Sequence, residues 1–142
     1  MFNCPSSGSG ESNKMKKDIE TGLDIKNLID HFYEKVKTDP LIGYVFTEAI
    51  KVNWEKHLPI MYSFWENTLF YTGNYSGNPM EIHQRINQKT PLRMEQFDRW
   101  NQLFTSSIND LFSGEKADLA KQRAYSISTI MKIKILEKNK IS

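Results

Sequence analysis

The side chains of this chain best suited to bind a transition metal are three histidines, His31, His57 and His83, each in a different segment. A Gly/Asn/Ser/Pro-rich loop over 73–79 interrupts two helical patterns and is followed at once by His83. His57 precedes this loop in an aromatic-rich stretch, and Trp100 follows it in another. We interpret His57, His83 and Trp100 as facing one pocket, in which His83 holds a bound group.

Two kinds of bound group are compatible with these histidines. A zinc site would use all three, but no two of them lie four residues apart on one helix, so the spacing gives zinc no support. A helical bundle with histidines on separate elements could instead enclose a planar cofactor, with one imidazole as an axial ligand of haem iron. Taken alone, an isolated histidine among Phe and Trp residues is more often a hydrogen-bonded structural residue.

The face of such a pocket opposite His83 would combine polar donors with apolar walls. A tyrosine hydroxyl and an indole N–H both donate hydrogen bonds, and donors at an open iron position would stabilise the negative charge that builds on bound dioxygen. The residues in this set are Tyr33, His57, Met61 and Trp100, with Phe46 and Phe64 as walls. Each of them is equally compatible with ordinary packing in a core.

Several function classes find no support in the chain. It carries no Gly-rich phosphate loop, nucleophile elbow or cysteine pair. The net charge is only +2, without a Lys/Arg stripe, so we expect no nucleic-acid partner. No apolar run approaches the roughly 20 residues of a membrane span. The single cysteine, Cys4, fits a reducing compartment, and we expect a cytoplasmic protein.

The length of 142 residues predicts one folded domain, which we place at 18–142 after a disordered Ser/Gly/Lys-rich leader at 1–17. Apolar residues at helical spacing predict a first helix capped by Asp24 and ended at Asp39-Pro40. Its apolar face consists of Ile25, Leu28, Ile29, Phe32, Tyr33 and Val36.

A second helix is predicted from a cap at Asn53 to Tyr71, and it carries His57. Pro59 falls inside this helix, where proline removes a hydrogen bond. We therefore expect a loosened first turn that leaves His57 at a mobile edge of the site.

Three further helices complete an all-α fold without a strand pattern. Pro79 is well placed to open the short helix that bears His83. Long helices are predicted over Leu92–Phe112 and Glu115–Glu137, separated by Ser113-Gly114. The expected inward face of the last helix is Leu119, Ala120, Ala124, Ile127, Ile130, Met131 and Ile135.

Five separated segments, read together, resemble the group III truncated haemoglobins in residue type, order and spacing. They are His31-Phe32-Tyr33-Glu34-Lys35-Val36, Trp54-x-x-His57-Leu58, Phe64-Trp65, Tyr75-x-Gly77-x-Pro79-Met80-x-x-His83 and Phe97-Asp98-Arg99-Trp100-x-x-Leu103-Phe104. The resemblance spans about 24–131, and the segment leading to His83 is the sharpest part of it.

This resemblance implies a truncated globin fold, a two-over-two helical sandwich around one haem b (iron protoporphyrin IX). His83 matches the proximal ligand of the iron, and His57 matches a distal histidine that acts as a gate. Tyr33 and Trp100 match the residues that hydrogen-bond the bound gas. The expected cofactor contacts are Phe46, Met61, Phe64 and Trp65, with Arg85 (or Lys56) as a rim cation for the propionates.

The resemblance also implies reversible binding of O₂, NO or CO. Two strong donors at the gas favour slow oxygen release, which suits NO detoxification or oxygen chemistry better than bulk transport. Such turnover requires a separate electron-donating reductase, since the chain has no flavin or nicotinamide motif; a peroxidase-like activity is a weaker alternative. We expect a monomer. The competing hypothesis is a cofactor-free helical interaction module whose aromatic residues form only a core.

Overall fold

The computed structural model describes residues 16–49, 53–72 and 92–141, and within these ranges the chain forms helices and no strand. None of the described helices is both long and apolar enough to cross a membrane. The predicted leader (apart from Lys16 and Lys17), the loop 73–79 and the short helix with His83 lie outside the described residues. The elements are α2 (Gly22–Thr38), the π-helix η1 (Val45–Ala49), α3 (Trp54–Phe70), α5 (Met94–Leu111) and α6 (Glu115–Ile141).

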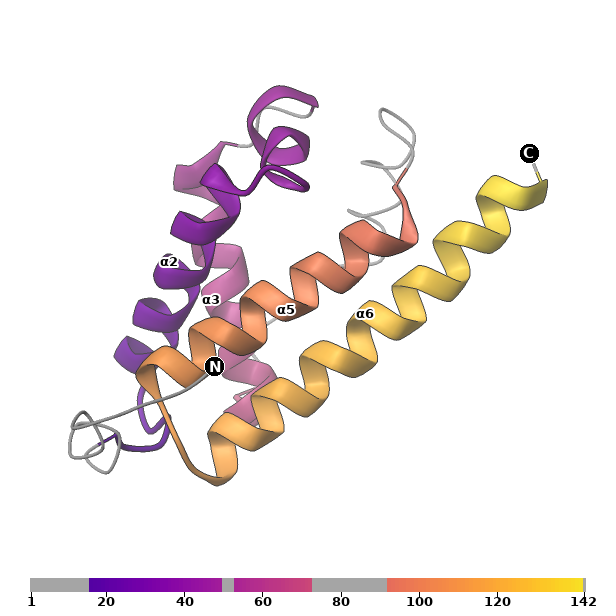
Figure 1. The fold of residues 1–142 in the computed structure, drawn as a ribbon. Coiled ribbons are helices and arrows are strands. Elements are labelled where there is room, and N and C mark those ends of the chain that lie inside the picture. Colours follow the sequence, from indigo (N-terminus) through magenta and orange to yellow (C-terminus); the bar gives the residue numbers. More distant parts are fainter. Residues whose placement is uncertain (1–15, 50–52, 73–91, 142) are drawn as a thin grey trace, which may run out of the picture.

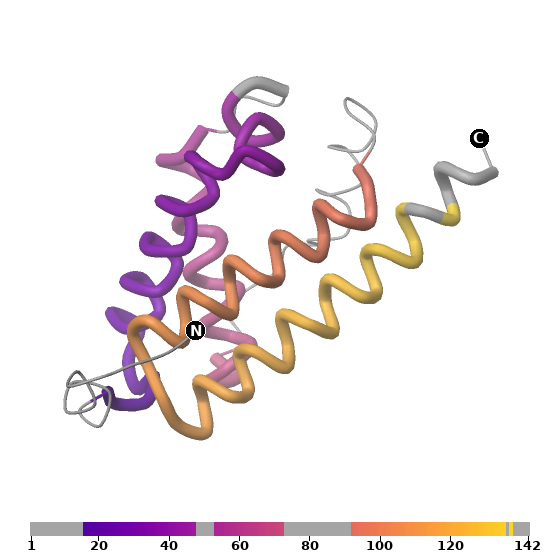
Figure 2. The backbone as a smooth tube through the Cα atoms, in the orientation of Figure 1, coloured from indigo at the N-terminus to yellow at the C-terminus, as the bar shows by residue number. Residues whose placement is uncertain are grey.

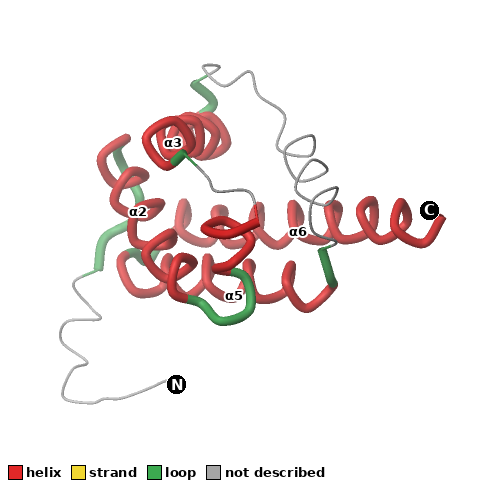
Figure 3. The backbone as a smooth tube through the Cα atoms, turned by 90° about the horizontal axis from the view of Figure 1, so that it is seen from above, coloured by secondary structure: helices red, strands yellow, loops and turns green. Residues whose placement is uncertain are grey.

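The four long helices form two pairs, as the smooth backbone trace in Figure 2 makes clear. α5 and α6 run antiparallel, side by side, and make the most extensive contact, while α2 packs against both α3 and α5. Seen from above, α3 points almost along the line of sight, whereas α5 and α6 run across the view (Figure 3). The pairs therefore cross, which is the two-over-two arrangement that the resemblance implies.

The start of α2 is fixed by a capping box. The hydroxyl of Thr21 accepts a hydrogen bond from the Asp24 amide at 3.2 Å, and the Asp24 carboxylate accepts one from the Thr21 amide at 3.1 Å. The predicted cap at Asp24 is therefore wrong by three positions: Thr21 is the cap and Asp24 is its partner within the first turn. The predicted end at Asp39 is confirmed, because Asp39 is the C-cap.

The helix α3 begins at Trp54 after its N-cap Asn53 and runs unbroken through Pro59 to Phe70. The expected loosened first turn is therefore wrong. Pro59 and Glu55 are both exposed, so the single carbonyl that loses its amide partner, that of Glu55, can turn to water. Tyr71 ends the helix in the left-handed conformation, at φ 56°.

The turn between α5 and α6 is tied to the chain before α2. Gly114 has a φ of +146°, and a Cβ there would lie 2.5 Å from Cγ of Asp18, so only glycine fits. The Asp18 carboxylate accepts hydrogen bonds from the amides of Lys116 and Ala117, both at 2.8 Å, and so caps α6. Lys17, at the end of the expected leader, accepts a backbone hydrogen bond from Ser113 through its carbonyl.

The core lies where the two helix pairs meet, and the predicted apolar face of α2 is buried in full. On α6, Ala120, Ala124, Met131 and Ile135 are buried as predicted. Ile130 is not, with 51% of its surface exposed, because its position on the helix turns it away from α5. The observed helix also continues to Ile141, beyond the expected end.

Candidate functional site

A largely apolar cavity opens between η1 with the segment just before it, the start of α5 and the middle of α6. Among the described residues, its polar lining consists of Gln96 and Ser128, both of which are buried. The apolar lining consists of Ile42, Val45, Phe46, Leu92, Phe97, Trp100 and Met131. A cavity with flat aromatic and branched walls and few polar groups suits a flat apolar ligand.

Beside this cavity, Tyr33 of α2 meets His57 of α3. The tyrosine hydroxyl lies 3.0 Å from Nε2 of the histidine, within hydrogen-bond distance. Tyr33 is buried and His57 is half-buried, so the imidazole covers the hydroxyl on the side of α3. The Tyr33 ring also packs on Phe46, with 6.0 Å between ring centroids, and Phe46 lines the cavity.

The protonation of this pair decides what Tyr33 can do. Burial raises the pKa of Tyr33 well above its usual value, so the phenol keeps its proton at neutral pH. If Nε2 of His57 carries a proton, it donates to the phenol oxygen and leaves the O–H of Tyr33 free for a ligand. If Nε2 is bare, Tyr33 donates to it instead. The tautomer of His57 therefore decides whether the O–H of Tyr33 can donate a hydrogen bond to a ligand.

Trp100 reaches the cavity from α5 on a platform of other aromatic rings. It stacks on Phe104, with 5.7 Å between centroids and 4° between planes, and meets Phe32 edge-on at 5.8 Å. Phe104 is itself stacked on Trp65 of α3 at 4.6 Å. The series Trp65, Phe104, Trp100 crosses the core and fixes the plane of the Trp100 indole at the cavity.

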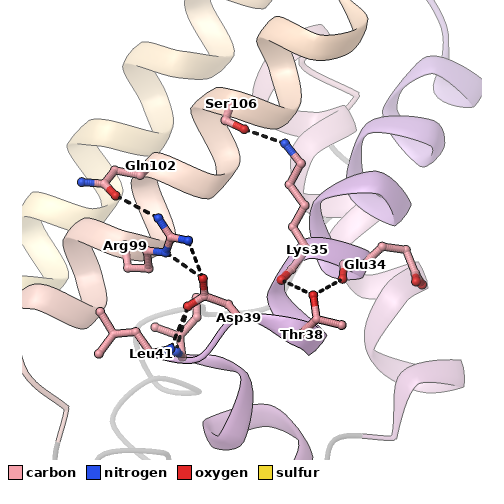
Figure 4. A network of polar contacts seen from close by, with 9 residues as sticks. Glu34, Lys35, Thr38, Asp39, Leu41, Arg99, Gln102 and Ser106 are labelled. Atoms are coloured by element: carbon pink, nitrogen blue, oxygen red, sulfur yellow. Dashed lines mark hydrogen bonds and ion pairs between the residues drawn. The ribbon is translucent and has the colours of Figure 1, made fainter. Parts of the chain in front are cut away.

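Next to Trp100, an ion pair closes the site end of α2 onto α5. Nε and Nη2 of Arg99 both lie 2.7 Å from Oδ1 of Asp39, as Figure 4 shows. The other carboxylate oxygen accepts the amides of Leu41 and Ile42 at 3.0 and 3.1 Å. Burial alone would raise the pKa of Asp39, but these hydrogen bonds outweigh it and lower the pKa below its usual value.

Gln96 supports the same end of the cavity. Its Oε1 accepts a hydrogen bond from the Arg93 amide at 2.9 Å, and its Nε2 donates to the hydroxyl of Tyr44, also at 2.9 Å. The first bond is local to the start of α5, and the second joins the first turn of α5 to the chain between α2 and η1. Gln96 thus places its amide at the wall with its hydrogen-bonding groups already used.

The structure brings together part of the predicted site. Phe46 and Trp100 line the cavity, and Tyr33 and His57 are hydrogen-bonded beside it. Met61 and Phe64 are half-buried against the core. Trp65 is fully buried against Phe104, and neither it nor Met61 nor Phe64 lines the cavity, so their contact with a cofactor stays a prediction. His83 and Arg85 lie outside the described residues.

Sequence reasoning missed most of the lining. Ile42, Val45, Phe97 and Met131 read as ordinary core positions, and Gln96 reads as a surface residue of a first helical turn. Ser128 sits on the buried face of α6 among alanines, and its burial could have been read from helical spacing. Its place in a cavity wall has no sequence signal.

The two described histidines have separate partners. His31 Nε2 lies 2.9 Å from Asp110, on the far side of α2 from the Tyr33–His57 pair. Within the described part of the chain, no three His, Cys, Asp or Glu side chains are grouped as a metal site would require. The arrangement is that of an apolar cavity flanked by hydrogen-bond donors.

Comparison with known proteins agrees with this arrangement. No family model matches the chain. It is 32% identical over 118 residues to the group 3 truncated haemoglobin ctb of Campylobacter jejuni, covering 81% of this chain and 91% of the relative. The crystal structure of group III truncated haemoglobin from the same organism superposes with a TM-score of 0.75 at 30% identity, covering 85% of this chain and 95% of that one. The truncated globin fold is thereby confirmed, and the chain belongs to the group III truncated haemoglobins.

Proposed function

We propose that this globin holds a haem b in the cavity between η1, α5 and α6 and binds O₂, NO or CO there reversibly. The observation that carries the proposal is the hydrogen-bonded Tyr33–His57 pair beside an apolar cavity lined by Phe46 and Trp100. Membership of a globin family supports haem as the cofactor. The Tyr33 hydroxyl and the His57 imidazole place hydrogen-bonding groups beside this largely apolar cavity.

The lining of the cavity fits a porphyrin. Phe46, Phe97 and Trp100 offer flat apolar surfaces, and Ile42, Leu92 and Met131 fill the spaces between them. When bound, the haem supplies an iron atom at which a diatomic gas is held. His83 is the proposed proximal ligand, for which its imidazole has to be neutral, and Arg85 is the proposed partner of a propionate.

Tyr33 and Trp100 are the proposed donors to the gas. Tyr33 keeps its proton because it is buried, and His57 fixes the phenol oxygen from the side of α3. The indole N–H of Trp100 donates from α5. Two donors from two helices hold a polarised gas more tightly than one, so oxygen should leave slowly. Slow release favours oxygen and NO chemistry over bulk transport.

NO detoxification is the reaction that we propose for this site. One NO and one O₂ combine to nitrate, NO₃⁻, with the uptake of one electron per turnover. Tyr33 and Trp100 would stabilise the negative charge that develops on the gas, beside a largely apolar cavity. The electron has to come from a separate reductase, which we expect as a transient partner of a monomeric globin.

The decisive experiment is a titration of the purified protein with haemin, followed by absorption spectroscopy. We expect a Soret band at one haem per chain, which His83→Ala abolishes or shifts strongly. His31→Ala is the matched control, because His31 pairs with Asp110 on the surface, and it should leave the band unchanged. A folded wild type that takes up no haem would favour the competing hypothesis, a cofactor-free interaction module.

A further inference from the structure

Trp54 occupies a central place among the residues of the candidate site. It is the first residue of α3, and its ring meets three site residues from three elements. Ring centroids lie 5.2 Å apart for Trp54 and Tyr33, 5.8 Å for Trp54 and His57, and 6.2 Å for Trp54 and Phe46. The first two contacts are edge-on, and the third is stacked. The indole therefore fills the corner between the two partners of the Tyr33–His57 hydrogen bond.

The outer face of the same indole carries a lysine. Nζ of Lys37 lies 4.8 Å from the Trp54 ring centroid, which is within the range of a cation–π contact. Glu34 accepts a hydrogen bond from the same ammonium at 3.3 Å. Lys37 is half-buried, with 34% of its side chain exposed, so its charge is only partly screened by water.

Two contacts join α2 to α3 near the site, and we call them the inner and the outer rung. Tyr33 and Lys37 lie four residues apart on α2, and Trp54 and His57 lie three apart on α3, so each pair shares one helical face. The inner rung is the hydrogen bond between Tyr33 and His57, and the outer rung is Lys37 on Trp54. Trp54 touches both rungs.

The first turn of α3 depends on such side-chain contacts. Its N-cap, Asn53, makes no side-chain cap hydrogen bond, and Pro59 cannot bond to the carbonyl of Glu55. The amides of Lys56 and His57 both rely on the Asn53 carbonyl, at 3.1 and 2.9 Å. Because the cap side chain adds no hydrogen bond, the position of this regular helix start also depends on what packs against it, and here that is Trp54.

We propose that Lys37 and Trp54 form a positioning pair that holds His57 on the hydroxyl of Tyr33 and so sets how readily a gas passes His57. The link to gas entry rests on the proposed haem function; the positioning of His57 does not. Lys37 keeps Trp54 seated on α2, and Trp54 in turn restricts the His57 ring from its edge. Without the pair, His57 leaves Tyr33 more often.

The test compares CO association to the haem-loaded protein by flash photolysis in a set of matched variants. Lys37→Gln removes the charge, and losing a partly exposed cation–π contact should speed association about threefold. Lys37→Arg keeps a cation over the ring and should restore the wild-type rate. Trp54→Leu removes both contacts and should exceed the effect of Lys37→Gln.

The control is Lys26→Gln. Lys26 lies on the same helix, with its Nζ 5.6 Å from the ring of Tyr62, also on α3, but at the end remote from the site. This substitution loses the same charge and the same kind of contact, and it should leave the CO rate unchanged. An equal effect of Lys26→Gln and Lys37→Gln would overturn the proposal, because it would reduce the pair to a general contribution to stability.

A second readout separates this proposal from that of haem binding. The ¹⁵N shifts of the His57 ring, measured in the purified protein, report whether Nε2 is hydrogen-bonded, whatever the outcome of the haemin titration. We expect these shifts to move toward those of a free imidazole in Lys37→Gln and Trp54→Leu and to return in Lys37→Arg. Unchanged shifts in the first two variants would refute the positioning pair while leaving the haem proposal intact.

Discussion

The two sides of α2 at the site are held by different kinds of interaction. Toward α5, the contacts are charged and short: Asp39 with Arg99 at 2.7 Å, and Lys35 with Asp110 at 2.7 Å. Toward α3, they are the hydrogen bond of Tyr33 with His57, an aromatic cluster around Trp54 and the cation–π contact of Lys37 with that ring. Charged hydrogen bonds resist displacement more strongly than neutral ones. The comparison indicates a rigid seam between α2 and α5 and an adjustable seam between α2 and α3.

This difference suits the proposed roles of Trp100 as a donor to the gas and of His57 as its gate. Trp100 stands next to Arg99 on α5, in the rigid seam, and its ring plane is fixed by Phe104. His57 stands in the adjustable seam. The donor that needs a constant position thus lies beside charged hydrogen bonds, and the side chain that has to move aside for a gas lies among weaker aromatic and cation–π contacts.

The largest expected effect comes from breaking the rigid seam at Arg99. In Arg99→Leu, the carboxylate of Asp39 stays buried but loses its charged partner, so we expect the free energy of unfolding to fall by about 2 kcal/mol. Urea unfolding at neutral pH measures it. Arg93→Leu, at the exposed N-cap of α5 six residues earlier, is the control and should change stability by less than about 0.5 kcal/mol. Equal effects of the two variants would contradict the rigid seam.

A somewhat smaller effect is expected from removing the indole donor. Trp100→Phe keeps an aromatic ring on Phe104 but loses the N–H, and the loss of one hydrogen bond worth about 1.4 kcal/mol should speed oxygen dissociation about tenfold. Stopped-flow measurement of oxygen release from the haem-loaded protein gives the rate. An unchanged rate would mean that the indole does not reach the gas.

The rigid seam should also weaken in acid. The folded-state pKa of Asp39 lies below its unfolded value, so its contribution is complete above the unfolded pKa and is lost as the pH falls through the folded one. In the Asp39→Asn variant, this part of the pH dependence is absent. Urea unfolding at pH 7 and pH 3 should therefore show a smaller difference for Asp39→Asn than for wild type. An identical difference would show that Asp39 does not titrate with unfolding.

The smallest effect is expected at the exposed end of the rigid seam. Asp110 binds both Lys35 and His31, but about half of its side chain is exposed to solvent, at 48%. Asp110→Asn should lower the free energy of unfolding by about 0.5 kcal/mol, and high salt should weaken the wild type by a similar amount. If Asp110→Asn lowered the free energy of unfolding as much as Arg99→Leu, solvent exposure would not explain how much each ion pair contributes to stability.

The sequence could predict elements but not every terminus. The apolar stripe of α2 is regular enough that its buried face is correct at each position, whereas Asp24 and Thr21 are both good caps and spacing does not choose between them. The loosened turn predicted from Pro59 was wrong because a proline inside a helix costs little stability where the carbonyl that loses its amide partner is exposed. The predicted burial of Ile130 was wrong because the apolar residues of α6 cover a wider part of the helix surface than α5 contacts.

The site was predictable only in part. The types of Tyr33, His57 and Trp100 are compatible with a pocket for a polar ligand and equally with core packing, and it is the resemblance that implies their roles. Their pairing does not follow from spacing, since Tyr33 and His57 stand on different helices whose crossing only the fold determines. The cation–π contact of Lys37 with Trp54 could not be predicted from the sequence for the same reason. Sequence periodicity does not predict which side chains of two different helices contact each other.

The central claim is that Tyr33, held by His57, donates a hydrogen bond to a gas in this cavity. The infrared stretching frequency of CO in the haem-loaded protein tests it most directly, because a nearby O–H donor lowers that frequency. Tyr62→Phe is the matched control, since Tyr62 bonds to Asp30 at the other end of the α2–α3 seam. The account predicts that Tyr33→Phe raises the frequency while Tyr62→Phe leaves it unchanged. The same frequency in wild type and Tyr33→Phe would contradict it.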